Sequence, residues 1–278
     1  MVSMMALASC GANGQDIRST ILNSSTNSNS IIILASRDEL SYLLINHLAK
    51  HFNIAQVVFE APHTRKMLRY RLKKLGAWTV AGQLAFLVID RLIIRRQSRP
   101  MIERLLNDHD ASPPDGRIPI LEVDSVNGAE VTALLNEHKP QVVVVTGTGI
   151  IAKRILALAP TFINIHVGIT PRYRGVHGGF WAVYEGRPDL AGTTIHRVDP
   201  GVDTGAIIAQ VPITVEPNDT YRTLPVKQYL AALDAMVKAV QSALDSKLTT
   251  YERDDLESKQ WYSPTPVDYW KFVQRLRN

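Results

Sequence analysis

An amide, an imidazole and a carboxylate lie at the ends of predicted strands or between them in the second half of this sequence. Asn164 and His166 are two residues apart in the apolar run 159–167, so both side chains lie on one face of a predicted strand. Asp203 stands in the glycine-bounded loop 201–205, between two further strand-like runs. Acyl transfer to an amine needs a hydrogen-bond donor for the carbonyl oxygen and an acceptor for the amine proton. These three side chains together supply both functions.

The segments that must position these groups alternate between strand and helix. Apolar runs predict strands at 31–34, 54–59, 118–123, 141–145 and 162–166, and amphipathic stretches predict helices near 38–48, 128–138 and 151–158. This alternation is typical of the α/β class with a doubly wound, mostly parallel, Rossmann-like sheet. Ligands of such sheets bind beyond the carboxyl ends of the strands, where His166 falls. Further on, the pattern predicts two strands at 193–198 and 206–215 and a long helix at 220–246.

Length and composition favour one large catalytic domain. The chain has 278 residues, 45% of them hydrophobic, and its 31 basic against 26 acidic residues make it mildly cationic. We expect a disordered tail over 1–30, a catalytic domain over 31–215 and a C-terminal helix and tail over 216–278. The single cysteine, Cys10, excludes an internal disulfide framework. It ends a stretch that resembles a lipoprotein cleavage box, but the apolar run before it is shorter than the roughly 7–15 residues of a signal, so we expect a cytoplasmic protein.

The segment 63–108 interrupts the alternation. Its apolar stretch, 75–94, follows a lysine- and arginine-rich run and precedes a second basic run, 95–99. About twenty apolar residues are enough to span a bilayer, although Gln83 and Asp90 lie inside this stretch. We favour a helical insertion that covers the sheet and turns a solvated basic face outward. Anion binding or peripheral contact with a membrane surface is the alternative.

Four short motifs follow one another after residue 160. They are Phe162-Ile163-Asn164-Ile165-His166, Pro171-Arg172-Tyr173-Arg174-Gly175, Gly192-Thr193-Thr194-Ile195-His196 and Asp203-Thr204-Gly205. In this order and spacing they resemble the 10-formyltetrahydrofolate-dependent formyltransferase family, which includes the sugar N-formyltransferases, glycinamide ribonucleotide transformylase and methionyl-tRNA formyltransferase. The resemblance is dense over 142–219 and is closest to the sugar N-formyltransferases. It implies a formyltransferase that uses 10-formyltetrahydrofolate as co-substrate and no metal.

By this resemblance Asn164, His166 and Asp203 form the catalytic trio. A neutral amide can hold the formyl oxygen as it gains negative charge, and an imidazole can exchange a proton near neutral pH. Asp203 can orient that imidazole and pass a proton toward the departing folate nitrogen. The resemblance also implies that His196 supports the aspartate, while an ordinary strand histidine is the alternative.

The resemblance further implies two binding regions. The co-substrate would meet backbone groups of two loops, and we assign it Gly147, Gly149, Ile150, Val198 and Gly201. The acceptor would meet Arg172, Tyr173, Arg174, Gly175 and Trp181, through ring stacking and through arginines that neutralise a diphosphate. Alternatively, Trp181 begins a helix and anchors it in the core. The family often has Ser-Leu-Leu-Pro after the histidine, whereas this chain has Gly168-Ile169-Thr170-Pro171, so the loop beside the acceptor departs from the family pattern.

Two features narrow the acceptor. The residues after the first strand, 35–39, include no glycine and two acids, which disfavours the phosphate loop of enzymes that act on the purine precursor. The segment 216–278 is mixed in charge, so we expect no nucleic-acid partner. A small amine remains, preferably the amino group of a nucleotide-linked sugar. Alternatives are an ornithine-type amine, glycinamide ribonucleotide, hydrolysis of formyltetrahydrofolate, or a non-catalytic scaffold that docks on anionic surfaces; a homodimer is a further expectation.

Overall fold

The computed structural model describes residues 30–62 and 64–277, and most of their strands form one large sheet. The sheet has seven strands in the order β3-β2-β1-β4-β5-β7-β8. They are β1 (Ser30–Ser36), β2 (Asn53–Glu60), β3 (Ile120–Val123), β4 (Val142–Thr146), β5 (Thr161–His166), β7 (Gly192–Arg197) and β8 (Ile207–Pro212). Strands β1 to β5 pair in parallel, and β7 and β8 are antiparallel additions at one edge. The predicted doubly wound, mostly parallel sheet is confirmed, while the predicted tail up to residue 29 lies outside the described residues.

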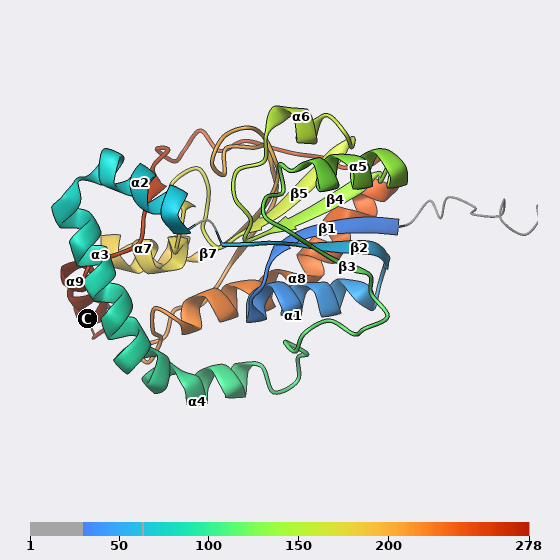
Figure 1. Ribbon diagram of the computed structural model, residues 1–278. Helices are drawn as coiled ribbons and strands as arrows, with labels where there is room; N and C mark the ends of the chain where they lie inside the picture. Colours follow the sequence, from blue (N-terminus) through green and yellow to red (C-terminus); the bar gives the residue numbers. More distant parts are fainter. Residues whose placement is uncertain (1–29, 63, 278) are drawn as a thin grey trace, which may run out of the picture.

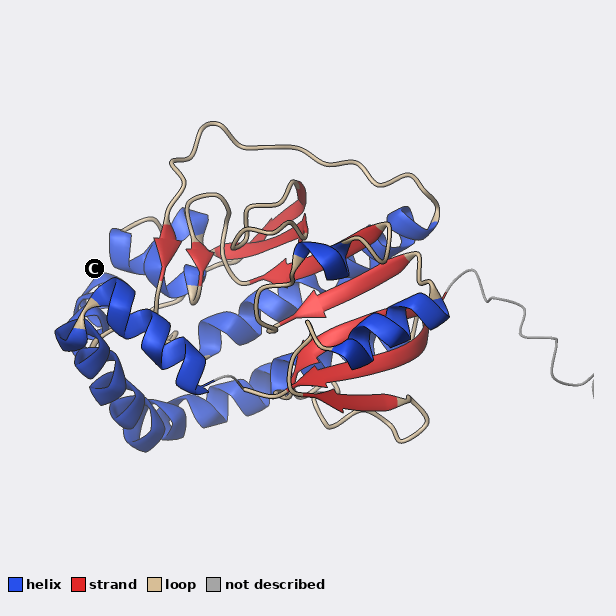
Figure 2. Cartoon of the chain, turned by 45° about the horizontal axis from the view of Figure 1, so that its top comes forward, coloured by secondary structure: helices blue, strands red, loops and turns tan. Residues whose placement is uncertain are grey.

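Helices cover both faces of this sheet (Figures 1 and 2). Helices α1 (Glu39–Ala49) and α8 (Thr223–Leu244) lie on one face, and α5 (Ala129–His138) and the short α6 (Lys153–Leu156) lie on the other. The start of α1 is fixed by Asp38, whose carboxylate accepts a hydrogen bond from Ser41 N at 2.9 Å. This is an ordinary N-cap, which satisfies one of the unpaired amides of the first turn.

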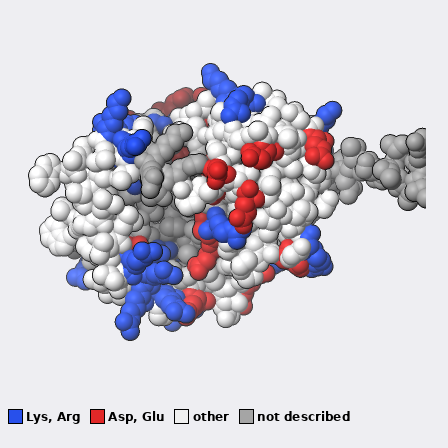
Figure 3. Space-filling view, viewed as in Figure 1, with Lys and Arg blue, Asp and Glu red and all other residues white. Residues whose placement is uncertain are grey.

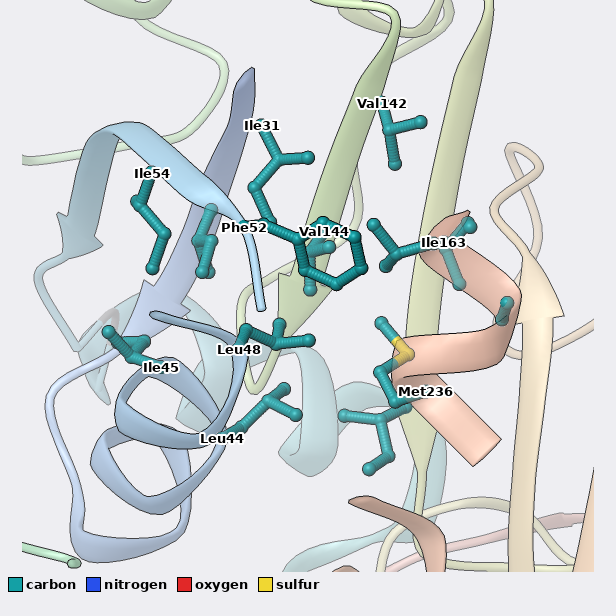
Figure 4. Close-up of a cluster of buried hydrophobic side chains, with 14 of the residues drawn as sticks. Ile31, Leu44, Ile45, Leu48, Phe52, Ile54, Val142, Val144, Ile163 and Met236 are labelled. Carbon is teal, nitrogen blue, oxygen red and sulfur yellow. The ribbon is translucent and has the colours of Figure 1, made fainter. Parts of the chain in front are cut away.

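The central strands are buried on both faces, which is why they read as unbroken apolar runs. Alternate side chains of β1 enter different clusters: Ile31 and Ile33 pack toward α1 and α8, and Ile32 and Leu34 toward α5 and α6. Figure 4 shows the first of these clusters, where Leu44 of α1 packs with side chains of the sheet and of α8. Each such side chain contributes about 1.5–3 kcal/mol by its burial. The result is a rigid frame for the residues at the carboxyl ends of the strands.

The segment between β2 and β3 is helical, as expected, but it does not cover the sheet. It forms α2 (Thr64–Leu75), α3 (Ala77–Ile89), the π-helical turn η2 (Asp90–Ile94) and α4 (Arg95–Leu105). These helices curve around the carboxyl ends of the strands (Figure 1), where α3 packs on α9 and α4 on α8. The expectation of a sheet cover is therefore wrong, because helices from other parts of the chain already occupy both faces.

By length and composition, the helix from Ala77 to Leu105 is long and apolar enough to cross a membrane. Its two interior polar groups, however, are tied to the rest of the protein. Gln83 Nε2 donates to Ser263 O at 2.8 Å, and Asp90 Oδ1 accepts from Arg222 Nε at 2.7 Å. Both polar side chains are buried, so these bonds hold one face of the helix on the domain.

The C-terminal segment is folded rather than an extended tail. It contributes β9 (Gln260–Trp261), which pairs in parallel with β6 (Arg174–Gly175), and α9 (Pro266–Arg277), which packs on α7 (Gly178–Glu185). A single 3-10 turn, η3 (Pro188–Leu190), follows α7. Phe272 of α9 is fully buried in a third cluster with aromatic residues of α3 and α7. Residues 260–262 of this C-terminal segment line the cavity of the candidate site.

Candidate active site

The two strands β5 and β7 bring three polar side chains to one place. Asn164 and His166 project from the same face of β5, and the antiparallel register sets His196 of β7 directly opposite Asn164. Their neighbours on β5, Ile163 and Ile165, point to the opposite face and pack in the core. Alternation along the strand thus fixes which side chains face the site.

The turn between β7 and β8 delivers Asp203 to the same place. Asp203 has a left-handed backbone, with φ of 50°, a conformation that aspartate tolerates better than most residues. Its Oδ2 accepts a hydrogen bond from Gly175 N at 2.9 Å and lies 3.5 Å from His166 Nδ1. Its Oδ1 lies 3.5 Å from His196 Nε2 and 3.4 Å from Asn164 Nδ2. The structure therefore brings together the proposed trio and the supporting histidine.

Backbone carbonyls orient both imidazoles. His166 Nε2 lies 2.7 Å from Tyr173 O, and His196 Nδ1 lies 2.8 Å from Arg197 O. A carbonyl can only accept, so the proton-bearing nitrogens are Nε2 of His166 and Nδ1 of His196. In its neutral form His166 then presents an unprotonated Nδ1 toward Asp203, where a proton arriving on the ring would be held. The unprotonated Nε2 of His196 accepts from Asn164 Nδ2 at 3.0 Å and fixes the amide.

Asp203 stays ionised in this environment. Burial disfavours its charged form, but the nearby imidazoles of His166 and His196 and the Gly175 amide outweigh burial and lower the pKa of the carboxyl to about 2. The charged Asp203 carboxylate lies 3.5 Å from His166 Nδ1, so a counter-charge stands beside the nitrogen that faces it. The pair is thus arranged to take up and release one proton.

These side chains open into a cavity of about 1510 Å³. Single ligand sites are commonly about 300–1,000 Å³, so there is room for two ligands side by side. All five residues that we assigned to the co-substrate line this cavity: Gly147, Gly149, Ile150, Val198 and Gly201. Gly149 N, however, already donates to Glu60 Oε2 at 2.7 Å, so this amide is engaged. Among the described residues, no group of His, Cys, Asp or Glu is arranged to hold a metal ion.

The residues expected to bind the acceptor are mostly placed elsewhere. Tyr173 is fully buried and Trp181 is 5% exposed, stacked on Trp261 at 4.5 Å, so the expectation that their rings stack on a ligand is wrong. Both rings instead fill the core between α7 and the C-terminal segment. Arg172 is paired with Glu185 and Glu257 and lines a separate cavity of about 460 Å³.

Two of the expected acceptor residues position the loop that carries Asp203. Arg174 Nη1 donates to Val202 O at 3.0 Å, and the amide of Gly175 holds Asp203 as described above. Gly175 also lines the cavity. Its φ of 98° and the closeness of Trp261 O, 2.2 Å from where a Cβ would stand, explain why glycine is needed here.

Sequence reasoning missed the basic residues that face this cavity. Arg71, Arg95 and Arg99 of the inserted helices line it, together with Arg222. Arg222 is engaged by Asp90 and Arg99 by Glu103, whereas no ion pair involves Arg71 or Arg95 within residues 30–62 and 64–277. The basic composition of the insertion was visible in the sequence. What it did not reveal was that part of the insertion turns inward at the end of the sheet.

Sequence reasoning also did not assign Gly168 to the site, although it lies against His166 and Tyr173. A Cβ at this position would lie 2.2 Å from Tyr173 O and 2.6 Å from His166 Nε2, the two atoms whose hydrogen bond orients the imidazole. We expect Gly168→Ala to lower kcat by about a hundredfold, the scale of a small misplacement of a catalytic group. The measurement is kcat together with the melting temperature. Gly116→Ala is the matched control, since nothing lies within 4 Å of its added methyl; a Gly168→Ala enzyme as fast as this control would contradict the role.

Comparison with known proteins points to one family. A sequence model described as Formyl transferase matches residues 8–240. The methionyl-tRNA formyltransferase of Anaeromyxobacter sp. (strain K) is 37% identical over 128 residues, which are 45% of this chain and 40% of that protein. The same enzyme of Desulfotalea psychrophila is 31% identical over 157 residues, or 54% of this chain and 48% of that protein. The chain thus spans less than half the length of these curated relatives.

Solved structures show the same fold. The N-formyltransferase from Helicobacter canadensis, in complex with folinic acid and dTDP-3-aminofucose, has a TM-score of 0.55 at 14% identity and covers 88% of this chain and 80% of its own. Glycinamide ribonucleotide transformylase 1 from Symbiobacterium toebii has a TM-score of 0.54 at 18% identity, covering 84% and 92%. At these identities the likeness concerns the fold alone.

Proposed function

The chain belongs to the formyl transferase family, and we propose that it transfers a formyl group from 10-formyltetrahydrofolate to the primary amine of a nucleotide-linked amino sugar. The observation that carries the transfer reaction is the convergence of Asn164, His166 and Asp203 on one cavity. Within a few ångströms it offers a neutral donor, a ring nitrogen free to take a proton and a carboxylate that stays charged.

Each side chain has a role that its contacts allow. The co-substrate supplies a formyl group bonded to a nitrogen; the amine bonds to the formyl carbon, the bond to the folate nitrogen breaks, and the amine loses the proton that the folate nitrogen gains. Asn164 Nδ2 donates to the formyl oxygen as that oxygen gains charge. His166 Nδ1 takes the amine proton, and Asp203, 3.5 Å away, stabilises the imidazolium until the proton is passed on.

The loops beside the trio fit a flat, uncharged ring system. One wall is the loop after β4, with Gly147 and Ile150, and the other is the β7–β8 turn, with Val198 and Gly201. Ile150 is 60% exposed although it is large and apolar, so a ring covering it would remove that surface from water. A pterin is of this chemical type.

Another part of the cavity lining suits an acceptor that carries phosphate. Arg71 and Arg95 line it and have no acidic partner among the residues that the structure describes, so both are available to an anion. The N-terminus of α1 is less suitable for phosphate, because Asp38 caps it and Glu39 occupies its first turn. A diphosphate-linked amine is therefore favoured over one that relies on a phosphate cradle after β1.

Methionyl-tRNA is the second candidate acceptor, because the curated relatives carry that name. The stretch that these relatives share with the chain is 128 to 157 residues long. It could hold the transfer chemistry without the groups that choose the acceptor. The same assay distinguishes the two candidates.

The test is release of tetrahydrofolate from 10-formyltetrahydrofolate in the presence of single acceptors, with formylated product identified by mass spectrometry. The panel comprises nucleotide-linked amino sugars, ornithine, glycinamide ribonucleotide, methionyl-tRNA and water alone. We expect rapid release only with a nucleotide-linked amino sugar. Faster release with another member of the panel would identify that compound as the acceptor instead. No release with any member would refute formyl transfer.

Neutralising the two available arginines should weaken acceptor binding selectively. For Arg71→Gln and for Arg95→Gln we expect kcat/KM for the acceptor to fall about tenfold or more, the value of one charge-assisted hydrogen bond, with KM for 10-formyltetrahydrofolate unchanged. Lys153→Gln and Lys238→Gln, at exposed positions of α6 and α8, are the charge-matched controls. Equal losses in all four variants would indicate a general charge effect and not a binding site.

A further inference from the structure

The inserted helix carries an apolar stripe on its outer face. Trp78, Ala81, Ala85, Val88 and Leu92 follow one another at intervals of three or four residues, so they lie along one side of α3 and η2, and all of them are exposed. Trp78 is 93% exposed, Leu92 68% and Val88 57%. The exposed side chains of Leu84, Leu87 and Ile93 widen the stripe. Soluble proteins rarely leave so many large apolar side chains together in water unless something covers them.

Basic side chains border this stripe. Lys73 precedes it, Arg91 stands within it and Arg96 follows it; all three are exposed, and none takes part in an ion pair in the described part of the chain. The only acidic residue between 64 and 102 is Asp90, which is buried against Arg222. Figure 3 shows Lys and Arg side chains in two groups at this end of the molecule, with an uncharged surface between them. The outer face of the segment is thus apolar at its centre and cationic at its rim.

This combination selects among the surfaces that could cover the stripe. A second copy of the chain would bring its own basic rim against this one, and like charges in contact disfavour that pairing. An anionic bilayer offers acyl chains to the apolar side chains and lipid phosphates to the rim. Insertion across the bilayer is opposed by the opposite side of the helix, where Gln83 and Asp90 are bonded to the domain.

We propose that this surface, the docking face formed by the exposed side chains of α3 and η2 with Lys73, Arg91 and Arg96, lies flat on an anionic lipid bilayer. The inner side of the same segment contributes Arg71 and Arg95 to the catalytic cavity. Docking therefore holds the cavity close to the lipid headgroups. Peripheral binding of this kind combines burial of apolar side chains with electrostatic attraction and weakens as salt rises.

The test is co-sedimentation of the full chain with vesicles, without co-substrate or amine, so that its outcome is independent of formyl transfer. We expect binding to vesicles of phosphatidylcholine with one third phosphatidylglycerol, and much weaker binding to phosphatidylcholine alone. Trp78→Gln/Leu92→Gln should lower the partition coefficient about tenfold or more. Lys73→Gln/Arg91→Gln/Arg96→Gln should lower it roughly a hundredfold, from about 1 kcal/mol for each charge near the surface.

The matched control is Lys153→Gln/Lys238→Gln/Lys247→Gln, which removes the same charge from exposed positions outside the segment. Its binding should stay within a factor of a few of the wild type, and all variants should keep the wild-type melting temperature. Absence of binding, equal binding to both vesicle types, or equal loss in control and rim variants would overturn the proposal. A wild-type dimer in light scattering that Trp78→Gln/Leu92→Gln converts to a monomer would identify the face as a subunit interface instead.

Discussion

His166→Ala is expected to lower kcat by at least about a hundredfold, the usual contribution of a positioned proton-transfer group. The reason is that the two ring nitrogens have different partners. Nε2 is committed to Tyr173 O at 2.7 Å, and Nδ1 faces the Asp203 carboxylate, so removal of the ring deletes the site to which the amine proton moves. The measurement is kcat and KM for each of the two substrates, acceptor and co-substrate, varied one at a time while the second substrate is held at a saturating concentration. KM should change little, because the lost interaction acts in the transition state.

Asp203→Asn tests the same proton path from the other end. The pKa of the Asp203 carboxyl is lowered to about 2, so this side chain is charged in the wild type. The substitution puts a neutral group of the same shape in its place, and the imidazolium loses its counter-charge. We expect a loss of similar size, and the double variant should be little worse than either single one, since both act on one proton. His138→Ala, at an exposed position on α5, is the control. Wild-type turnover in either active-site variant would exclude this proton path.

The strands and the proposed catalytic residues were readable because their signals are local. Central parallel strands are buried on both faces, so β1 and β4 appear as apolar runs. The two-residue spacing of Asn164 and His166 then fixes their common face. That Asp203 lies between glycines in a short turn suggested a loop, but its approach to His166 depends on pairing between β5 and β7, which lie about thirty residues apart in the chain.

The parts that sequence reasoning missed depend on contacts between distant segments. Tyr173 and Trp181 have the residue types of ligand-stacking rings, but the same rings serve equally well in a core, and their burial is decided by the later segment around Trp261. The insertion looked like a sheet cover because its apolar stretch must pack somewhere. Helices α1, α5, α6 and α8 already occupy both faces of the sheet, so the insertion packs at the end of the sheet instead. Arg71 and Arg95 of the insertion line the cavity there.

Asn164→Ala is expected to remove about 3 kcal/mol of transition-state stabilisation, as for loss of an oxyanion donor. This loss should appear as a lower kcat, with KM nearly unchanged. One hydrogen of Asn164 Nδ2 is used by His196 Nε2 at 3.0 Å. The other points to Asp203 Oδ1 at 3.4 Å, a long contact that a negatively charged formyl oxygen can replace. Neither histidine has a ring proton to spare for that oxygen, because each donates to a backbone carbonyl. The amide is therefore the donor that the four clustered side chains leave for the formyl group.

Two companion variants make this prediction decisive. Asn164→Asp keeps the shape but replaces the donor by a second carboxylate beside Asp203, so its kcat should fall at least as far as that of Asn164→Ala. Asn136→Ala, at an exposed position of α5, should leave kcat unchanged. If Asn164→Ala instead raised KM for the co-substrate with kcat intact, the amide would serve ground-state binding, and stabilisation of the formyl oxygen would have to come from backbone amides of the neighbouring loops.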